Sequence, residues 1–260
     1  MVFAKKSLGQ NFLISPGVVE KIAQAGEIQP GEQVVEIGPG KGVLTAALLS
    51  AGANVIAVEK DHRLIPLLNT RFKIEISKGS LVLLHGDVLE SFDALSLQIK
   101  GSYKVIANIP YYITGQIIRL FLSIEERPGT MILMVQKEVS DRIIARDGKE
   151  SILSLSVKIY STPTLITNVS RGNFFPVPNV DSAVLKLSNI KTPFKDKKEE
   201  SRFFETVRAG FSQKRKKLSS NLTAAMPKHM ITEKFLALKL DDNVRAEDVP
   251  LETWIEIVKQ

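Results

Sequence analysis

The chain has 260 residues, 44% of them hydrophobic, a formal net charge of +7 and no cysteine. This length supports one full hydrophobic core and predicts a smaller second domain, and the positive charge favours a polyanionic partner such as nucleic acid or acidic lipid. The lack of cysteine excludes disulfides and thiolate chemistry. No apolar run is long enough to span a bilayer, and the three histidines are too scattered to predict a metal site. We therefore expect a soluble, unexported, cytoplasmic protein without a metal.

Short apolar runs rich in branched residues alternate with helical patterns between residues 33 and 136, which predicts repeated βαβ units and a parallel sheet. The expected strands are residues 34–37, 54–58, 81–85, 104–107 and 131–135. After residue 151, the runs SLSVKIYS and SAVLKLSN predict an antiparallel addition at the sheet edge. The expected fold class is α/β, with a doubly wound, mostly parallel, seven-stranded, Rossmann-like sheet.

The charged segment at residues 189–200 predicts a linker or an exposed helix start. Phe203, Phe204, Val207 and Phe211 then recur at helical spacing, and further helices are expected around residues 231–240 and 251–258. We predict a first domain at residues 1–188 and a small helical domain at residues 189–260.

The stretch VVEIGPGKG is a predicted buried strand that runs into Gly38, Gly40 and Gly42, where missing side chains let the backbone approach a ligand. Val43 stands where a dinucleotide-binding turn has its third glycine, and the Lys-Ser/Thr ending of a phosphate-binding loop is missing. By itself the stretch fits either a nucleotide-type site or an ordinary strand-to-helix turn.

Two acids narrow this choice, because Glu59 follows the second predicted strand and Asp87 follows the third. A carboxylate after the second strand can accept both hydroxyls of a ribose, and one after the third can accept an adenine amine. Neither position suits a phosphate. Each acid alone also fits a helix cap, but together with Glu36 they favour a cationic nucleoside, and S-adenosylmethionine meets that requirement.

The sequence NIPYY follows the fourth predicted strand directly. The side-chain oxygen of Asn108 and the backbone carbonyl of Ile109 are placed to accept the two hydrogens of an adenine amine. Pro110 would stiffen the turn and Tyr111 would stack on the base. Taken alone, the motif also fits a proline turn with a surface tyrosine.

With these motifs the sequence resembles the ribosomal RNA adenine dimethyltransferases, a family that includes small-subunit enzymes and the large-subunit enzymes of macrolide resistance. The likeness spans nearly the whole chain and rests on several motifs in order: KKSLGQNFL (5–13), VVEIGPGKGVLT (34–45), VEKD (58–61), GDVL (86–89), NIPY (108–111), MVQKEV (134–139), FFPVPNVDSAV (174–184) and FSQKRKKL (211–218). The ending RAEDVPLETW (245–254) is similar to the small-subunit branch.

The resemblance implies a class I methyltransferase fold and S-adenosylmethionine as cofactor. It implies cofactor contacts at Asn11, Leu13, Gly38, Glu59, Asp87, Val88 and Asn108. It further implies catalytic roles for Asn108, Ile109, Pro110 and Tyr111, with Phe174 facing Tyr111 across the flipped adenine.

The basic run Lys214, Arg215, Lys216 and Lys217 is the candidate RNA-binding segment, although a solvated helix face would have the same charges. Two departures from the family are visible. The stretch ESILSLS (150–156) replaces a Lys-x-Tyr-Gly-Arg-Leu-Ser motif, and Lys214 replaces an arginine. The first puts local RNA contacts in question, and the second weakens a bidentate phosphate contact.

We therefore expect a monomer that dimethylates adjacent adenines in a hairpin near the 3′ end of small-subunit rRNA, within a pre-ribosomal particle. The nearest rival acts on the large subunit and shares every catalytic residue. More distant rivals are a DNA adenine methyltransferase, a non-catalytic assembly or transcription factor, and a nicotinamide oxidoreductase.

Overall fold

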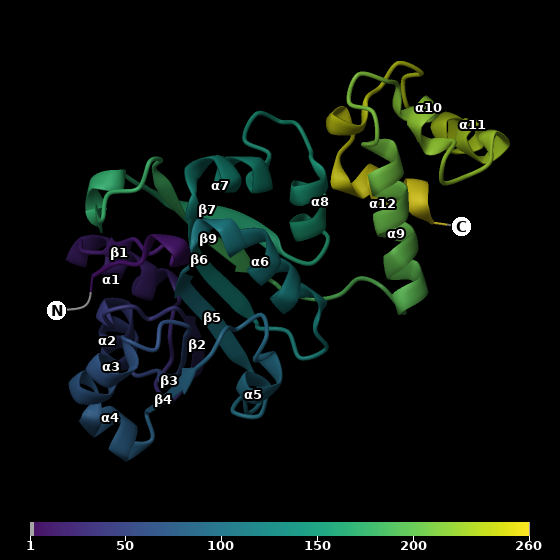
Figure 1. Cartoon of the computed structure of the whole chain (residues 1–260). Coiled ribbons are helices and arrows are strands. Elements are labelled where there is room, and N and C mark those ends of the chain that lie inside the picture. The colour runs from purple at the N-terminus through teal and green to yellow at the C-terminus, as the bar shows by residue number, and fades with distance from the viewer. Residues whose placement is uncertain (1–2, 260) are drawn as a thin grey trace. The chain divides into compact units, whose positions relative to one another are not determined.

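A seven-stranded sheet organises the larger of two units, which comprises residues 1–140 and 162–190 (Figure 1). The computed structural model describes residues 3–259, with the side chain of Lys6 left out. The strands of the sheet are β2 (Gln33–Ile37), β3 (Asn54–Glu59), β4 (Leu81–His85), β5 (Tyr103–Asn108), β6 (Thr130–Gln136), β7 (Thr162–Val169) and β9 (Ser182–Ser188). Their order is β4-β3-β2-β5-β6-β9-β7; the first five are mutually parallel, β9 runs antiparallel to both its neighbours, and β7 therefore points the same way as the first five. This confirms the predicted fold class.

The five predicted parallel strands are confirmed, each within the bounds that the structure gives. The central residues of β2, β3, β5 and β6 are mostly buried, as strands covered on both faces require, and β6 is buried from Met131 to Val135. Those of β4, the strand at the sheet edge, are half-buried. The chain builds β2, β3 and β4 outward in one direction and then returns to place β5 and β6 on the other side of β2. Right-handed crossovers in opposite directions put helices on both faces and open a crevice between β2 and β5.

The helices of this unit are mostly short connections between strands. They are η1 (Lys6–Leu8), α1 (Pro16–Ala25), α2 (Val43–Ser50), α3 (Ile65–Arg71), α4 (Lys73–Lys78), α5 (Phe92–Ser96), η2 (Tyr111–Ile113), α6 (Thr114–Ser123) and η3 (Arg171–Asn173), while α7 (Lys137–Ile144) runs from this unit into the second. A separate two-stranded ribbon pairs β1 (Phe12–Leu13) with β8 (Phe174–Phe175) in antiparallel fashion. This ribbon joins the N-terminal arm to the segment before β9.

One predicted strand is wrong. The run SLSVKIYS lies mostly in helix α8 (Ile152–Lys158), and the antiparallel edge strand is instead β7, which begins at Thr162. Ser151 caps the helix: its side chain accepts from the Ser154 backbone N–H, and the Ser154 side chain accepts from the Ser151 backbone N–H, so the two form a capping box. The alternation of Leu155 and Val157 resembles a strand, but a short apolar run does not distinguish the two structures.

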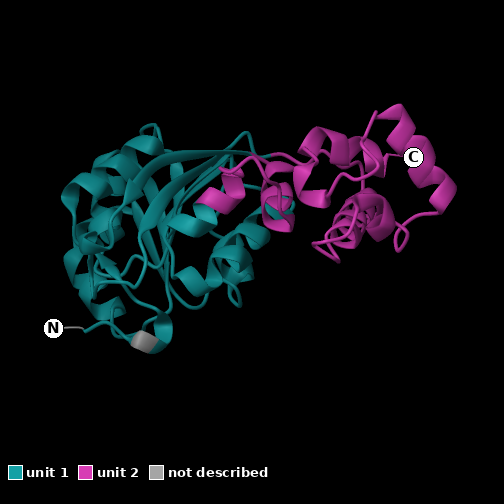
Figure 2. Cartoon of the chain, turned by 90° about the horizontal axis from the view of Figure 1, so that it is seen from above, with its two compact units in different colours: residues 1–140, 162–190 teal, residues 141–161, 191–260 magenta. Residues whose placement is uncertain are grey.

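The second unit, residues 141–161 and 191–260, is helical (Figure 2). Besides α8 it contains α9 (Lys197–Gly210), α10 (Leu218–Leu222), α11 (Lys228–Ala237), η4 (Ala246–Asp248) and α12 (Leu251–Val258). Its core includes Trp254, which is fully buried and stacks on Phe211 with ring centroids 5.7 Å apart. Among the residues that the structure describes, no helix is long and apolar enough to cross a membrane.

The predicted division into one domain that ends at residue 188 and another that begins at residue 189 stays a prediction. The chain passes from the sheet unit to the helical unit after Ile190, close to that boundary. The second unit also includes residues 141–161, which the sequence pattern did not indicate.

We predict that Gly42→Ala lowers the free energy of unfolding by roughly 2–4 kcal/mol. The alanine would be strained by the left-handed backbone conformation of this position, and its Cβ would also overpack the core. Gly42 has φ +78°, and a Cβ there would lie 2.5 Å from the Phe72 ring. Gly38→Ala is the matched control: its φ is +67°, but its Cβ would meet nothing within 4 Å, so we expect a loss of only about 1–2 kcal/mol. Urea unfolding curves measure both, and equal losses would contradict the packing argument.

Candidate active site

One cavity of the sheet unit opens at the carboxyl ends of the parallel strands, where the crevice of such a fold is expected. It brings together residues from four strand ends and from the N-terminal arm. Ten of the site residues predicted from the sequence line it: Asn11, Leu13, Gly38, Glu59, Asp87, Val88, Asn108, Ile109, Pro110 and Tyr111. Their convergence is a finding, whereas their individual roles stay predictions.

Glu59, the last residue of β3, ties the glycine turn after β2 to its own strand end. Its carboxylate accepts the backbone N–H of Gly40 at 3.0 Å and that of Asp61 at 2.7 Å. The side chain is buried, and burial raises its pKa, while the two backbone donors act in the opposite direction. Because a carboxylate has about four lone-pair sites, Glu59 can still accept ribose hydroxyls.

Glu36, on β2, is the most deeply buried acid that lines the cavity. Its Oε2 atom has no hydrogen-bond partner among the described residues. Burial, together with the charge of Glu59, raises the pKa of Glu36 to about 8. A buried acid with a free oxygen favours a ligand that carries a positive charge or a hydrogen-bond donor.

Asp87 follows β4 and is paired with a lysine that sequence reasoning did not assign to the site. Lys60 Nζ lies 2.5 Å from Asp87 Oδ2, and the Leu89 backbone N–H donates to Oδ1 at 3.0 Å. Burial raises the pKa of Asp87, but the Lys60 hydrogen bond and charge outweigh it and leave the pKa below its usual value. Because the Lys60 side chain is half exposed, it can move away into solvent, and the Asp87 carboxylate can then accept a hydrogen bond from a ligand.

The NIPY turn continues from β5 into η2. Asn108 Nδ2 donates to the Asn11 backbone carbonyl at 3.4 Å, which makes Oδ1 the amide atom left to accept a ligand hydrogen. The Tyr111 hydroxyl lies 2.6 Å from the Ser182 hydroxyl at the start of β9. Partial burial raises the pKa of Tyr111, so its hydroxyl stays neutral at physiological pH. Ser182, which fixes the ring, was not identified from the sequence.

The N-terminal arm is anchored to the sheet by a buried acid beside the cavity. Arg63 contacts both oxygens of Asp61, at 2.8 and 2.6 Å, and Gln10 Nε2 donates to the same carboxylate at 2.9 Å. These contacts hold the pKa of Asp61 well below its usual range. The VEKD motif contains Asp61, but nothing in the sequence pattern connects it with Gln10.

Phe174 was expected to face Tyr111 across a flipped base. It is 1% exposed, packs in the core cluster of the sheet unit and is not among the residues that line the cavity. A base would therefore reach this ring only after a movement of the surrounding segment, and the role implied by the resemblance stays a prediction.

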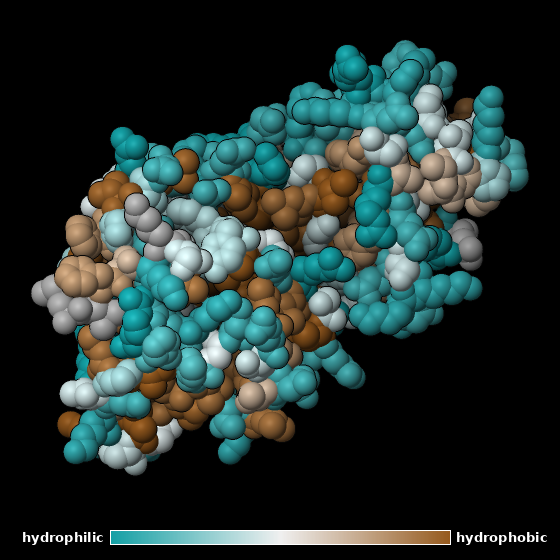
Figure 3. All heavy atoms as spheres, in the orientation of Figure 1, coloured by the Kyte–Doolittle hydropathy of each residue, from teal (hydrophilic) through white to brown (hydrophobic). Residues whose placement is uncertain are grey.

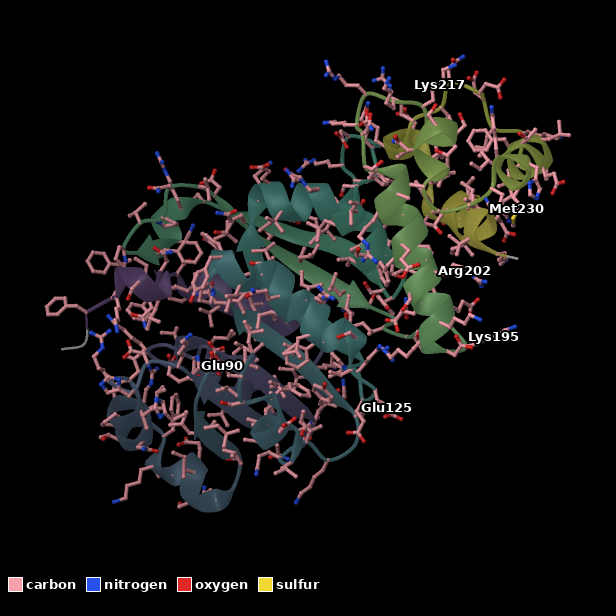
Figure 4. All side chains as sticks on the ribbon, turned by 45° about the vertical axis from the view of Figure 1, so that its right-hand side comes forward. Glu90, Glu125, Lys195, Arg202, Lys217 and Met230 are labelled. Atoms are coloured by element: carbon pink, nitrogen blue, oxygen red, sulfur yellow. The ribbon has the colours of Figure 1, made fainter. Side chains whose placement is uncertain are left out.

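The predicted RNA-binding run lies in the helical unit, in the loop between α9 and α10. Lys214, Arg215, Lys216 and Lys217 are all exposed, and Lys217 projects from the edge of the unit in Figure 4. The loop is held from inside by Asn221, whose Nδ2 donates to the carbonyls of Gly210 at 2.6 Å and Gln213 at 3.1 Å. Asn221 is buried and was missed in the sequence, where it looks like any polar helix residue.

In the part of the chain that the structure describes, no three histidine or acidic side chains are grouped to hold a metal ion. The rings of His62 and His85 approach each other with centroids 6.5 Å apart, in an edge-to-face arrangement.

Comparison with known sequences gives one family. The profile described as "Ribosomal RNA adenine dimethylase" matches residues 1–260. A protein named "Ribosomal RNA small subunit methyltransferase A" from Dehalococcoides mccartyi is 40% identical over 253 residues, which are 96% of this chain and 86% of that protein. A protein of the same name from Moorella thermoacetica is 39% identical, over 97% of this chain and 91% of its own.

Solved structures share the fold over nearly the full length. The dimethyladenosine transferase from Plasmodium falciparum superposes with a TM-score of 0.77 at 26% identity and covers 95% of each chain. The 23S rRNA methyltransferase ErmE also gives 0.77, at 23% identity, over 95% of this chain and 98% of its own. At 23% identity, the likeness to ErmE shows a shared fold and nothing more.

We predict that Glu36→Gln flattens the pH dependence of stability. With a folded pKa of about 8 against 4.5 for the ordinary group, folding takes up a proton between these values, so wild-type stability falls as pH rises toward 8. Glutamine cannot ionise, so its advantage over wild type should grow by about 2–5 kcal/mol from pH 5 to pH 9.

Thermal unfolding of the cofactor-free protein at several pH values measures this difference. Glu90→Gln, at an exposed position labelled in Figure 4, is the control and should run parallel to wild type. Parallel curves for Glu36→Gln as well would contradict a buried, neutral Glu36.

Proposed function

The chain belongs to the ribosomal RNA adenine dimethylase family, and from this membership we propose that its substrate is small-subunit rRNA. Like its family, it transfers methyl groups from S-adenosylmethionine to the exocyclic amine of adenine. The proposed targets are adjacent adenines of a hairpin near the 3′ end, met in a pre-ribosomal particle. The observation that carries the proposal is the cavity in which the predicted cofactor residues and the NIPY turn meet.

The cavity fits the cofactor on two independent grounds. Gly38 leaves open space where a side chain would stand, and Glu36 presents a buried oxygen without a partner among the described residues. We propose that Glu59 accepts the ribose hydroxyls, that Asp87 and Val88 receive the adenine, and that Asn11, Leu13 and Gly38 contact the rest of the cofactor. When bound, the cofactor supplies an electrophilic methyl group.

The chain's own contribution to the reaction is positioning. An adenine amine is a weak nucleophile because its lone pair is delocalised, so its nitrogen must be held near a tetrahedral geometry. We propose that Asn108 Oδ1 and the Ile109 carbonyl accept the two amine hydrogens. Pro110 would restrict the backbone conformation of the turn that holds them. The Tyr111 ring, fixed through Ser182, then stacks on the base. No strong base is needed, because the amine becomes acidic as its nitrogen gains positive charge.

The helical unit is proposed to bind RNA through the exposed basic loop. Its four adjacent cations, with no acid between Phe211 and Leu218, suit a phosphate backbone. Asn221 supports this by fixing the loop from within, which lowers the conformational entropy lost when RNA binds. We further propose independent domains at residues 1–188 and 189–260, a monomeric state, no metal requirement, no membrane association and a cytoplasmic location.

The experiment that tests the function supplies radiolabelled S-adenosylmethionine with undermethylated small subunits, large subunits or duplex DNA, followed by digestion to nucleosides. The proposal expects label in 6-dimethyladenosine from small subunits alone. Label from large-subunit RNA would assign the protein to the rival substrate. No label despite cofactor binding would instead favour a non-catalytic assembly factor.

We predict that Asn108→Ala reduces methyl transfer at least 100-fold, since one of the two amine acceptors is lost, while the cofactor Kd changes less than about fivefold. Glu59→Ala should show the opposite pattern, with cofactor binding weakened at least about tenfold. Single-turnover transfer and calorimetric titration measure the two quantities. Normal turnover by Asn108→Ala would overturn the proposed geometry.

We predict that the double variant Lys216→Gln, Lys217→Gln weakens binding to small-subunit RNA and reduces the slope of log K against log salt by about 1–2. The double variant Lys73→Gln, Lys78→Gln, at exposed positions on α4 of the sheet unit, is the charge-matched control and should leave the slope unchanged. Filter binding at several salt concentrations measures this. An unchanged slope in the double variant would exclude phosphate contacts from these two lysines.

A further inference from the structure

The β1–β8 ribbon has two faces of different character. Its register pairs Phe12 with Phe175 and Leu13 with Phe174. Directly opposed side chains of an antiparallel pair lie on the same face, with Cβ atoms about 4.5–5.5 Å apart. Leu13 and Phe174 are buried and Phe12 is only 8% exposed, whereas Phe175 is 61% exposed, so the face that carries Phe12 and Phe175 reaches solvent at Phe175.

Phe12 connects this face with the active site. Its ring lines the cavity, lies 3.1 Å from the position a Cβ of Gly40 would take, and carries Lys41 Nζ at 4.9 Å from its centroid. Phe175 therefore lies next to Phe12, a ring that lines the cavity, and is itself exposed to solvent. It is not itself part of the cavity wall.

The loop around Phe175 is unusually apolar for an exposed segment. Val177 is 58% exposed and Val180 43%, and Ile14, whose backbone N–H donates to the Asn173 carbonyl across the ribbon, is 58% exposed. Figure 3 shows apolar atoms gathered at the left edge of this face of the sheet unit, over the N-terminal arm and the loop that carries β8. Several exposed apolar side chains in one segment mark a binding surface more often than a single one does.

The charges nearby favour an anionic occupant. Lys41 lies over Phe12, and the side chain of Arg171 is exposed three residues before Phe174. Asp181, the acid of this loop, accepts the Arg171 backbone N–H at 2.9 Å. An aromatic ring beside cations is the combination that holds single-stranded RNA, because bases stack on the ring while phosphates meet the cations.

We propose that Phe175 stacks on a nucleotide next to the target adenine and so holds single-stranded RNA at the mouth of the cavity. This rests on the proposed function, in which one adenine leaves its stack to enter the site. The flanking nucleotide then loses a stacking neighbour, and Phe175 replaces it. Phe175 is thus a positioning residue for the RNA, distinct from the buried Phe174.

The test compares Phe175→Ala, Phe175→Leu and Phe175→Trp in the full chain. With undermethylated small subunits, Phe175→Ala should raise KM about tenfold, while kcat and the S-adenosylmethionine Kd change less than about twofold. Phe175→Trp should keep the wild-type KM, and Phe175→Leu should behave like alanine because it lacks a π face. Leu236→Ala, at an 81% exposed position on α11, is the control and should change nothing.

A second measurement does not depend on turnover. A single-stranded RNA oligonucleotide with 2-aminopurine beside an adenine should lose fluorescence on binding wild type and Phe175→Trp, but not on binding Phe175→Leu. Full activity of Phe175→Leu would assign the surface to an apolar protein partner and overturn the proposal. A Phe175→Ala variant that kept the wild-type KM and still quenched the 2-aminopurine fluorescence would also overturn the proposal. If the wild-type protein quenches the probe but methylates no small subunits, the proposed function fails, while the proposed stacking of a nucleotide on Phe175 is supported.

Discussion

The buried carboxylate of Glu59 holds together the part of the molecule on which the site depends. It receives backbone N–H groups from Gly40, in the turn after β2, and from Asp61, in the turn after β3. A buried acid that lost these donors would be left with an uncompensated desolvation cost, so both turns are constrained at once. A Cβ at Gly38, in the same turn, would meet nothing within 4 Å, so the turn leaves open space there.

Three acids around one cavity set its electrostatic character. Glu36 and Glu59 lie in the interior, where burial disfavours their charge, while Asp87 keeps its charge with the help of Lys60. Such a site is stabilised by a ligand that brings positive charge and hydrogen-bond donors, and it disfavours phosphates. This is the physical reason why a methyl donor with a cationic centre suits this cavity better than a dinucleotide.

The walls of the cavity come from segments far apart in the chain, and each is fastened by a polar contact. Gln10 fastens the N-terminal arm to Asp61, and Asn108 donates to the carbonyl of Asn11. Ser182 fastens Tyr111 to the start of β9. The groups proposed to position the adenine amine are thus held by contacts between elements, as precise positioning of a weak nucleophile requires.

The sequence by itself determined the parallel strands, the turns that end them and seven residues that line the cavity, because strand periodicity places each turn at a known edge of the sheet. The other three predicted residues that line it, Asn11, Leu13 and Val88, came from the resemblance to the family. Only the tertiary structure decided which acids are paired, that residues 152–158 form a helix, and that Phe175 and not Phe174 faces solvent. The acid pairing and the exposure of Phe175 depend on partners distant in the chain, whereas the helix begins at a local cap between Ser151 and Ser154 that its apolar pattern does not reveal. In a strand, moreover, a shift of one residue exchanges the buried and exposed faces, and the register that fixes it is set by the paired strand.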